Sequence, residues 1–328
     1  MPTECRVYWL HAISSLHVGA GRGEGFIDLP LAREKVSDFP FIPGSSIKGV
    51  FADAKGASLG ASKKLREAYL DPSETQANPD YQPIVRAAFG AADPQASSTA
   101  GANAGAMVFT DARLICLPIA SLFGTFAWCT SRFVLRRLAR DLTHAGFNEP
   151  LPIPPDRRRD EAAIPQGPPA SVVVGDNALF LRELKLPLVS CGVTSVWTER
   201  LATWIFPTNK DADWKTLFRE RFVVLPDDLF NAMTRHGTEV QAHVRIDSEL
   251  KRVAEGALWY EESLPAETIL AGLVWCDRIY GVKGVTPAQV MSLCSPTPVV
   301  TQIGGKASVG KGLVRQVFTA PPPGGTRS

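Results

Sequence analysis

The chain has 328 residues, of which 45% are hydrophobic and 21% charged, so it has the material for a core and is not an intrinsically disordered protein. Its formal net charge of +2 neither indicates nor excludes a nucleic-acid partner. No apolar run reaches the roughly 18 residues of a membrane span, and no cationic, apolar leader opens the sequence, so we expect a cytoplasmic protein with no membrane partner. Six cysteines without C-x-x-C or zinc-finger spacing are typical of reduced, buried thiols.

A glycine-rich loop follows the first predicted strand, which we place at 4–15. Glycines recur at 19, 21, 23 and 25, a spacing that permits positive φ angles and lets another chain approach the backbone closely. His17 enters this loop, and Asp28 leaves it on a stiff segment beside Leu29 and Pro30. Asp28 is therefore a candidate for chemistry, while a glycine-rich turn with a solvated carboxylate is the alternative.

A helix start follows at residues 43–46. Pro43 and Gly44 predict a turn, and Ser45 or Ser46 is a natural N-cap for a helix that runs to about residue 55. The free N–H groups of such a start attract anions such as phosphate. Lys48 lies in the first turn, where the helix dipole disfavours a cation, so it indicates either a nearby anion or a solvated side chain.

Two segments look like insertions or mobile loops. Residues 57–106 are rich in Ala, Ser, Pro, Asp and Gly, and residues 148–170 contain seven prolines and three consecutive arginines. Elsewhere the hydrophobic pattern predicts strands at 106–116, 171–174, 179–186 and 268–277 and helices at 127–142, 196–205 and 227–233. The helix at 127–142 carries four arginines near one face, which either follow a phosphate backbone or form a solvated surface: Arg132, Arg136, Arg137 and Arg140.

A long β-hairpin is predicted over 240–268. Two extended runs, 241–247 and 257–265, flank a polar connection, which places Lys251 and Arg252 at the tip. Side chains alternate along a strand, so Glu261 and Glu262 point to opposite faces, and we expect at most one of them to point inward. Trp259 is expected to pack rather than to stack on a base.

A second glycine loop closes the sequence. Residues 305–311 fit G-x-x-x-x-G-K, but Gly312 stands where a P-loop offers a hydroxyl, and a strand follows where a P-loop opens a helix. A P-loop nucleotidase is therefore the remote alternative. What remains is an open backbone at Gly304, Gly305 and Gly310 beside two lysines, Lys306 and Lys311, a combination that suits a phosphate chain. We expect the segment 318–328 to be a disordered tail.

Several of these blocks together carry a family resemblance. They are H-x-G-x-G at 17–21, GFIDLP at 25–30, IPGSSIKG at 42–49, FTDAR at 109–113, RID at 245–247 with ALWYEE at 257–262, LPAET at 264–268, and QIGG with GKG between 302 and 312. Each block is weak alone, but the ordered set resembles the RAMP superfamily, and in particular the repeated backbone subunit of type III-B CRISPR effectors, the Cmr complexes.

The resemblance implies a single α+β domain over 1–328 with an RRM-like (ferredoxin-like) core, large loop insertions and a thumb formed by the hairpin. It implies a subunit that polymerises head to tail on CRISPR guide RNA beside other type III-B subunits. Each thumb would displace one nucleotide, and complementary target RNA would be cleaved at that regular interval with a divalent metal, Mg²⁺ or Mn²⁺. A non-catalytic filament subunit of the same kind of complex is the alternative.

The resemblance also assigns roles to residues. It places the essential carboxylate, and with it the metal, at Asp28. His17 is a candidate general base or phosphate contact, and Tyr260 and Glu261 are candidates to complete the catalytic site from the hairpin. Guide binding is expected from phosphate and sugar contacts because a guide-carrying protein must accept any sequence. The expected RNA-binding residues are Ser45, Ser46, Lys48, Lys251, Arg252, Gly304, Gly305, Lys306, Gly310 and Lys311.

Overall fold

The computed structural model describes residues 4–21, 23, 27–55, 81–91, 103–149, 151–156, 158, 160–167, 173–174, 178–246 and 253–322. The helices are α1 (Gly44–Ala54), α4 (Tyr81–Phe89), α5 (Arg132–His144), α6 (Gly192–Ile205), α7 (Ala212–Arg221), α8 (Asp227–His236) and α9 (Pro287–Met291), with 3-10 turns η2 (Asn209–Asp211) and η3 (Ala307–Val309). The strands are β1 (Cys5–Ala12), β2 (Phe41–Ile42), β3 (Gly90–Ala91), β4 (Asn103–Ala104), β5 (Met107–Phe109), β6 (Ala112–Ala120), β7 (Phe126–Ser131), β8 (Ala162–Pro165), β9 (Val173–Val174), β10 (Ala178–Leu181), β11 (Leu184–Cys191), β12 (Phe222–Leu225), β13 (Glu239–Ile246), β14 (Val253–Ser263), β15 (Ile269–Cys276), β16 (Val299–Gln302) and β17 (Leu313–Thr319). The fold is therefore a mixed α+β fold, as the sequence predicts.

A 13-stranded sheet carries most of these strands. Its order is β16-β17-β1-β15-β6-β7-β12-β8-β11-β10-β9, with β2 beside β6 and β5 beside β15. β1 lies between β15 and β17 and is antiparallel to both, so that Trp9 faces Ala271 on one side and Val317 on the other. Residues 7–10 are all buried, which explains why this strand has a continuous apolar run rather than an alternating one.

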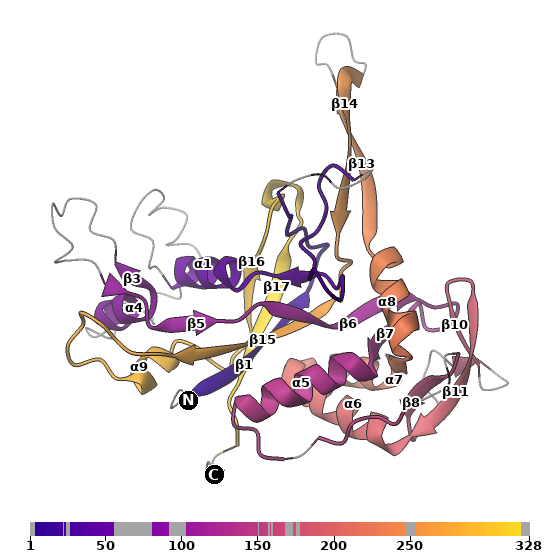
Figure 1. The fold of residues 1–328 in the computed structure, drawn as a ribbon, viewed down its shortest axis with the longest axis horizontal. Coiled ribbons are helices and arrows are strands. Elements are labelled where there is room, and N and C mark those ends of the chain that lie inside the picture. Colours follow the sequence, from indigo (N-terminus) through magenta and orange to yellow (C-terminus); the bar gives the residue numbers. More distant parts are fainter. Residues whose placement is uncertain are drawn as a thin grey trace.

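Helices gather in two groups against this sheet (Figure 1). One group, α1, α4 and α9, packs near β5 and β15, while α5, α6 and α7 pack against β6, β7 and β8 and against one another. Phe51 of α1 packs the first group against the sheet, because its ring centroid lies 5.3 Å from that of Phe318 in β17. Trp204 of α6 covers β1, where its ring stacks on Trp9 at 5.7 Å. All six cysteines are free and buried, as expected.

The structure corrects several boundaries. The predicted strand at 106–116 is two strands, β5 and β6, because Thr110 and Asp111 interrupt it and the Thr110 carbonyl accepts a hydrogen bond from the Tyr8 hydroxyl at 2.6 Å. The predicted helix at 127–142 begins as strand β7, and α5 starts only at Arg132 after the Ser131 N-cap. A short apolar run does not distinguish a buried strand from a buried helix, which accounts for this error. Helix α7 was not predicted.

Parts of the two predicted insertions belong to the body of the fold. Helix α4, inside 57–106, buries Ile84 and Val85 in the core, and β8, inside 148–170, pairs with β11 and β12 in the main sheet. The predicted tail is also too long, because β17 extends to Thr319 and Phe318 is buried. Residues 57–80, 92–102, 168–172 and 323–328 lie outside the described residues.

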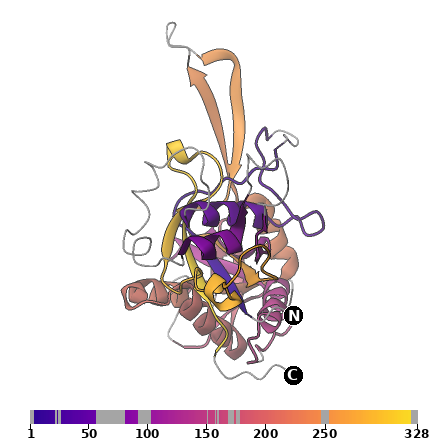
Figure 2. The same ribbon diagram turned by 90° about the vertical axis from the view of Figure 1, so that its left-hand side faces the viewer.

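The predicted hairpin is formed by β13 and β14, which pair with each other in a sheet of their own. Both views show it projecting from the body as a long two-stranded arm (Figures 1 and 2). Its root lies beside the loop that follows β1, and the closing glycine loop between β16 and β17 leaves the sheet at the same end, where the Ile13 N–H donates to the Leu313 carbonyl at 2.8 Å. The fold thus brings both glycine loops to the root of the arm.

Candidate RNA-cleavage site

The segment that carries Asp28 lies along the free edge of β14. The Asp28 and Leu29 N–H groups both donate to the Tyr260 carbonyl at 3.1 Å, and the Glu262 N–H donates to the Leu29 carbonyl at 3.0 Å. The Tyr260 N–H in turn donates to Asp28 Oδ2 at 2.8 Å. Asp28 is exposed, so main-chain hydrogen bonds hold its carboxylate at the root of the arm while it faces solvent.

Glu261 and Glu262 point to opposite faces of β14, as alternation predicts, but both are buried, with exposed fractions of 0% and 3%. The expectation that only one points inward is wrong, because protein covers both faces of the strand at the root of the arm. Leu29 bridges to Glu261, so alternation places Asp28 on the face of Tyr260 and Glu262. We call the face with Asp28, Tyr260 and Glu262 the carboxylate face.

The opposite face of β14 is a cluster of lysines around Glu261, which we call the lysine face. Lys311 Nζ lies 2.7 Å from Glu261 Oε1 and donates to Ser263 Oγ at 3.0 Å, and Lys306 Nζ lies 3.2 Å from Glu261 Oε2. Lys306 also sits over the ring of Trp259, which stacks on His243 as predicted for a packing residue. The Lys311 side chain was expected to contact RNA, but it is buried and its ammonium group is paired with Glu261. The Lys306 side chain is 36% exposed.

The pKa of Glu261 sets a pH dependence of stability. Burial alone would raise it, but the hydrogen bond and charge of Lys311, with Lys306, outweigh burial and lower the pKa. A carboxylate with a lowered folded pKa stabilises the protein above its unfolded pKa of about 4.3 and loses that contribution as the pH falls through the folded value. We therefore expect Glu261→Gln to flatten the acid limb of stability against pH, measured by urea unfolding between pH 7 and pH 3. An acid limb identical to that of the parent protein would contradict this expectation.

His17 is buried against the backbone rather than open to a substrate. Its Nδ1 lies 2.6 Å from the Glu262 carbonyl, which only accepts, so Nδ1 carries the proton. A side chain at position 19 would place its Cβ 3.0 Å from His17 Nε2, and the His17 carbonyl accepts from the Gly305 N–H at 3.0 Å. In this structure His17 joins the two glycine loops to β14.

The closing loop packs against the opening loop through its glycines. Gly304 and Gly312 have φ angles of +81° and +82°, and a Cβ there would lie 2.2 Å from the His17 carbonyl oxygen and 2.1 Å from that of Ile303. Only glycine fits such positions. Gly310 also has a positive φ. η3 is followed directly by β17, so no helix opens after the G-x-x-x-x-G-K sequence, and the rejection of a P-loop is confirmed.

The start of α1 differs from the prediction. The helix begins at Gly44, its N-cap is Pro43, and neither Ser45 nor Ser46 caps it with a side chain. The Gly44 N–H donates to Asp111 Oδ1 at 2.8 Å, so a carboxylate of the chain already lies at this helix start.

Lys48 lies on α1, away from the root of the arm. Its Nζ donates to the Met107 carbonyl at 2.8 Å, and partial burial lowers its pKa. The structure therefore separates these α1 residues from Asp28 and Glu261. Lys251 and Arg252 lie outside the described residues.

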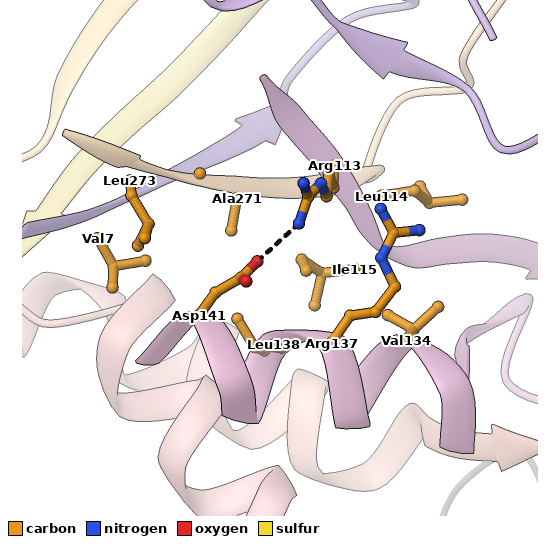
Figure 3. A pocket seen from close by; sticks show the side chains of 11 residues that line it. Val7, Arg113, Leu114, Ile115, Val134, Arg137, Leu138, Asp141, Ala271 and Leu273 are labelled. Carbon is orange, nitrogen blue, oxygen red and sulfur yellow. Dashed lines mark hydrogen bonds and ion pairs between the residues drawn. The ribbon is translucent and has the colours of Figure 1, made fainter. Parts of the chain in front are cut away.

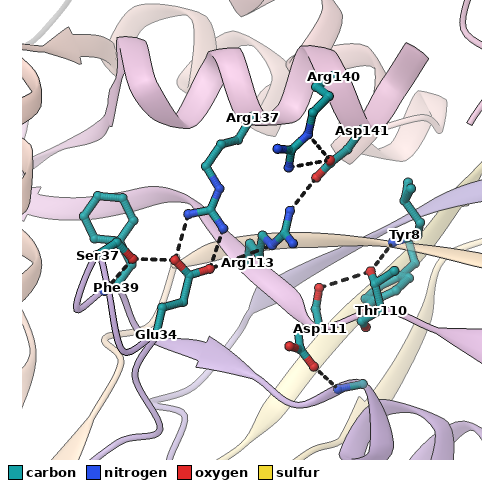
Figure 4. A network of polar contacts seen from close by, with 12 residues as sticks. Tyr8, Glu34, Ser37, Phe39, Thr110, Asp111, Arg113, Arg137, Arg140 and Asp141 are labelled. Atoms are coloured by element: carbon teal, nitrogen blue, oxygen red, sulfur yellow. Dashed lines mark hydrogen bonds and ion pairs between the residues drawn. The ribbon is translucent and has the colours of Figure 1, made fainter. Parts of the chain in front are cut away.

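Helix α5 anchors the segment that follows Asp28 (Figure 4). Arg137 binds both oxygens of Glu34, at 2.7 and 2.5 Å, and Arg113 binds Asp141 at 2.9 Å. Burial would raise the pKa of Glu34, but these arginines and Ser37 lower it. A narrow cavity beside this network, between α5 and the sheet, is lined by the same arginines (Figure 3). Their charges are paired, so Arg137 supports the loop rather than tracking a phosphate backbone.

Whether the residues around Asp28 could hold a metal ion depends on how many carboxylates face the root of the arm. Among the described residues, no group of three or more His, Cys, Asp or Glu side chains is placed to hold a metal by itself. One oxygen of the exposed Asp28 carboxylate accepts from Tyr260, and Glu261 is neutralised by lysines on the other face. Of the residues that the structure describes at the root of the arm, Asp28 alone thus offers an exposed carboxylate, and phosphate oxygens would have to complete the coordination of Mg²⁺ or Mn²⁺.

Sequence reasoning missed the buried arginine beside this site. Arg33 NH2 lies 2.5 Å from Glu262 Oε1, although the two residues are 229 positions apart in the chain. Arg33 lies five residues after Asp28, and nothing in its local sequence indicates its partner. Only the pairing of 28–29 with β14 brings the two side chains together.

Comparison with known proteins shows the family and the fold. Residues 9–315 match the RAMP superfamily, and the chain belongs to that family. A curated relative is the CRISPR system Cmr endoribonuclease Cmr4 of Pyrococcus furiosus, which is 28% identical over 312 residues, or 93% of this chain and 92% of the relative.

Solved structures with the same fold include oligomeric Cmr4 from Pyrococcus furiosus, with a TM-score of 0.67 and 23% identity over 96% of this chain and 98% of that one. A chain of the type III-B Cmr-beta complex bound to cognate target RNA has a TM-score of 0.64 and 18% identity, over 97% of this chain and 98% of that one. At these identities the structures establish the fold. No helix within the described part of the chain is long and apolar enough to cross a membrane.

Proposed function

We propose that the chain is a guide-RNA-binding backbone subunit of a type III-B CRISPR complex that cleaves complementary target RNA at regular intervals. The observation that carries the proposal is the exposed carboxylate of Asp28, held by the main chain at the root of a projecting arm. The 28% identity to a Cmr endoribonuclease over nearly the whole chain supports this choice over a non-catalytic filament subunit.

The partners that follow from this proposal are guide RNA, target RNA, further copies of the chain and other type III-B subunits. The likeness to an oligomeric Cmr4 and to a chain of an RNA-bound Cmr complex supports these partners. Within the fold, we also propose that the antiparallel strands around β1 and β15 correspond to the predicted RRM-like core. The cytoplasm is the compartment in which such a complex would work.

The proposed reaction uses the nucleophile that RNA carries. The 2′-hydroxyl oxygen attacks the adjacent phosphorus to form a 2′,3′-cyclic phosphate and gives its proton to solvent water, while the P–O5′ bond breaks in line with the attack and the 5′-oxygen takes up a proton from water. A regular A-form helix does not allow that alignment, so an arm that splays one nucleotide would supply the positioning. Asp28 is placed to orient the 2′-hydroxyl or to hold the metal, which when bound would stabilise the charge on the phosphate. Tyr260 contributes its backbone N–H, which orients Asp28.

Two predicted catalytic residues take other roles in this proposal. Glu261 is buried and neutralised by two lysines, so it fits a counter-ion that holds Lys306 beside the arm rather than an acid or base. His17 joins the two glycine loops. Lys306, half exposed over Trp259, is the residue of the lysine face best placed to meet an RNA phosphate.

The test is cleavage of a complementary RNA by the assembled complex. We expect product ends at a constant spacing, cleavage that stops with EDTA and returns with Mg²⁺ or Mn²⁺, and guide binding that weakens steeply with salt and shows little base preference. A target that is bound and never cut would instead favour the filament subunit. Cleavage that is unaffected by EDTA would contradict the metal while leaving the RNA-cleaving role in place.

A further inference from the structure

We propose that the ion pair between the half-buried Arg33 and the buried Glu262 positions Asp28 for the cleavage reaction, an inference that rests on the proposed function. Glu262 uses both carboxylate oxygens. Oε1 lies 2.5 Å from Arg33 NH2 and accepts from the Thr238 hydroxyl at 2.8 Å, while Oε2 accepts from the Leu31 N–H at 2.9 Å. The two side chains are 4% and 16% exposed, for Glu262 and Arg33 respectively, so the pair is shielded from solvent.

Arg33 extends the contact to two further segments. Its NH1 donates to the Asp38 carbonyl at 2.8 Å, and both terminal nitrogens lie 3.3 Å from the Thr234 carbonyl near the end of α8. The pair therefore joins the loop after Asp28, the turn at Asp38, the end of α8 and strand β14. Because the Arg33 guanidinium binds two backbone carbonyls and the Glu262 carboxylate, it is fixed in one orientation.

The pair acts on Asp28 through a short stretch of backbone. Leu31, clamped by Glu262, lies three residues after Asp28, and Tyr260, whose N–H holds the Asp28 carboxylate, lies two residues before Glu262. The Glu262 N–H also holds the Leu29 carbonyl at 3.0 Å. Glu262 thus binds the loop after Asp28 at two points, with its carboxylate at the Leu31 N–H and with its own N–H at the Leu29 carbonyl. Arg33 and Glu262 do not touch the reacting atoms in this proposal, so they are positioning residues.

Stability alone does not explain this arrangement. Two buried charges are costly to desolvate, and apolar residues of similar volume often stabilise a fold as well or better. A charged pair with directional bonds does fix where a segment lies, and a misplacement of about 1 Å at a reacting group costs up to about 10²-fold in rate. The exposed Asp28 is flanked by a glycine-rich loop, so it needs such an anchor more than a residue within the sheet does.

The experiment compares Glu262→Gln with the parent protein in the assembled complex. Glutamine keeps the size and an acceptor for Leu31 but removes the charge that faces Arg33. We expect single-turnover cleavage at saturating target to fall about 10- to 100-fold, target affinity to stay within twofold, and amide hydrogen exchange to quicken at Asp28 and Leu29 but not in β1. Adding Arg33→Gln to Glu262→Gln is expected to cause a smaller loss than Arg33→Gln causes alone, because both changes break the same ion pair and only the bonds of Arg33 to the Asp38 and Thr234 carbonyls are lost in addition.

A matched control is Asp211→Asn, which removes another shielded carboxylate paired with an arginine, Arg315 at 2.7 Å, away from the arm. Its cleavage rate is expected to equal that of the parent. Parent-like cleavage and exchange in Glu262→Gln, beside an inactive Asp28→Asn, would overturn the positioning role and leave the proposed function standing. If the parent complex never cleaves, the proposed function fails, and unchanged exchange at Asp28 and Leu29 would then separately refute the anchoring.

Discussion

Replacing Asp28 by Asn is expected to lower target-RNA cleavage by about 10²- to 10⁴-fold, the range typical of losing a positioned acid–base group. The substitution removes the charge that would hold a metal or orient the 2′-hydroxyl. It keeps an oxygen that accepts from the Tyr260 N–H, so the loop should stay on the edge of β14. The measurement is the single-turnover rate of the assembled complex on a labelled complementary RNA, with target affinity determined in parallel.

Asp277→Asn is a suitable control for this loss, because Asp277 is also exposed and follows β15, away from the root of the arm. It is expected to cleave at the parent rate. Guide binding and subunit assembly should be unchanged in both variants, since both are isosteric. An Asp28→Asn complex that cuts as fast as the parent would remove Asp28 from the reaction.

Replacing Lys311 by Met is expected to destabilise the fold by about 3 kcal/mol, at the lower end of the cost of breaking a buried ion pair. The change leaves Glu261, with an exposed fraction of 0%, without its closest cation, and only the half-exposed Lys306 remains beside it. The closing loop and β14 are expected to loosen together because this pair joins them. Urea unfolding at pH 7, compared through the midpoint at constant slope, measures the difference.

The effect of Lys311 can be separated from the general loss of a positive charge. Lys306→Met removes the more exposed partner of the same carboxylate and is expected to cost about 0–1 kcal/mol, as exposed pairs do. Combining Lys311→Met with Glu261→Gln should recover part of the stability, since no uncompensated charge then remains buried. Equal losses for the two lysine variants would show that burial does not set the strength of the pair.

Patterns within a few residues of the sequence predicted the strands, helices and loops that such short patterns determine. The apolar run of β1, the hairpin, helices α6 and α8 and the two glycine loops all follow from spacing and residue type, and the order of the motifs identified the family. Boundaries such as that between β7 and α5 were misplaced because a short apolar run, here residues 126–129, suits a buried strand or the start of a helix.

The site was only partly predictable, because its decisive contacts join distant positions. The structure brings together Asp28 and Tyr260, which the family resemblance assigned to one site, and their part in cleavage stays a prediction. The burial of both glutamates, the pairing of Lys311 with Glu261 and the pairing of Arg33 with Glu262 depend on which segments cover the two faces of β14. That covering is a property of the tertiary fold, and no periodicity in the chain encodes it.

The hydrogen bond that holds the Asp28 carboxylate comes from the backbone N–H of Tyr260 and not from its side chain. Any residue with a backbone N–H can supply that bond, whereas proline cannot. A substitution at position 260 by any residue other than proline should therefore leave the hydrogen bond to the carboxylate in place.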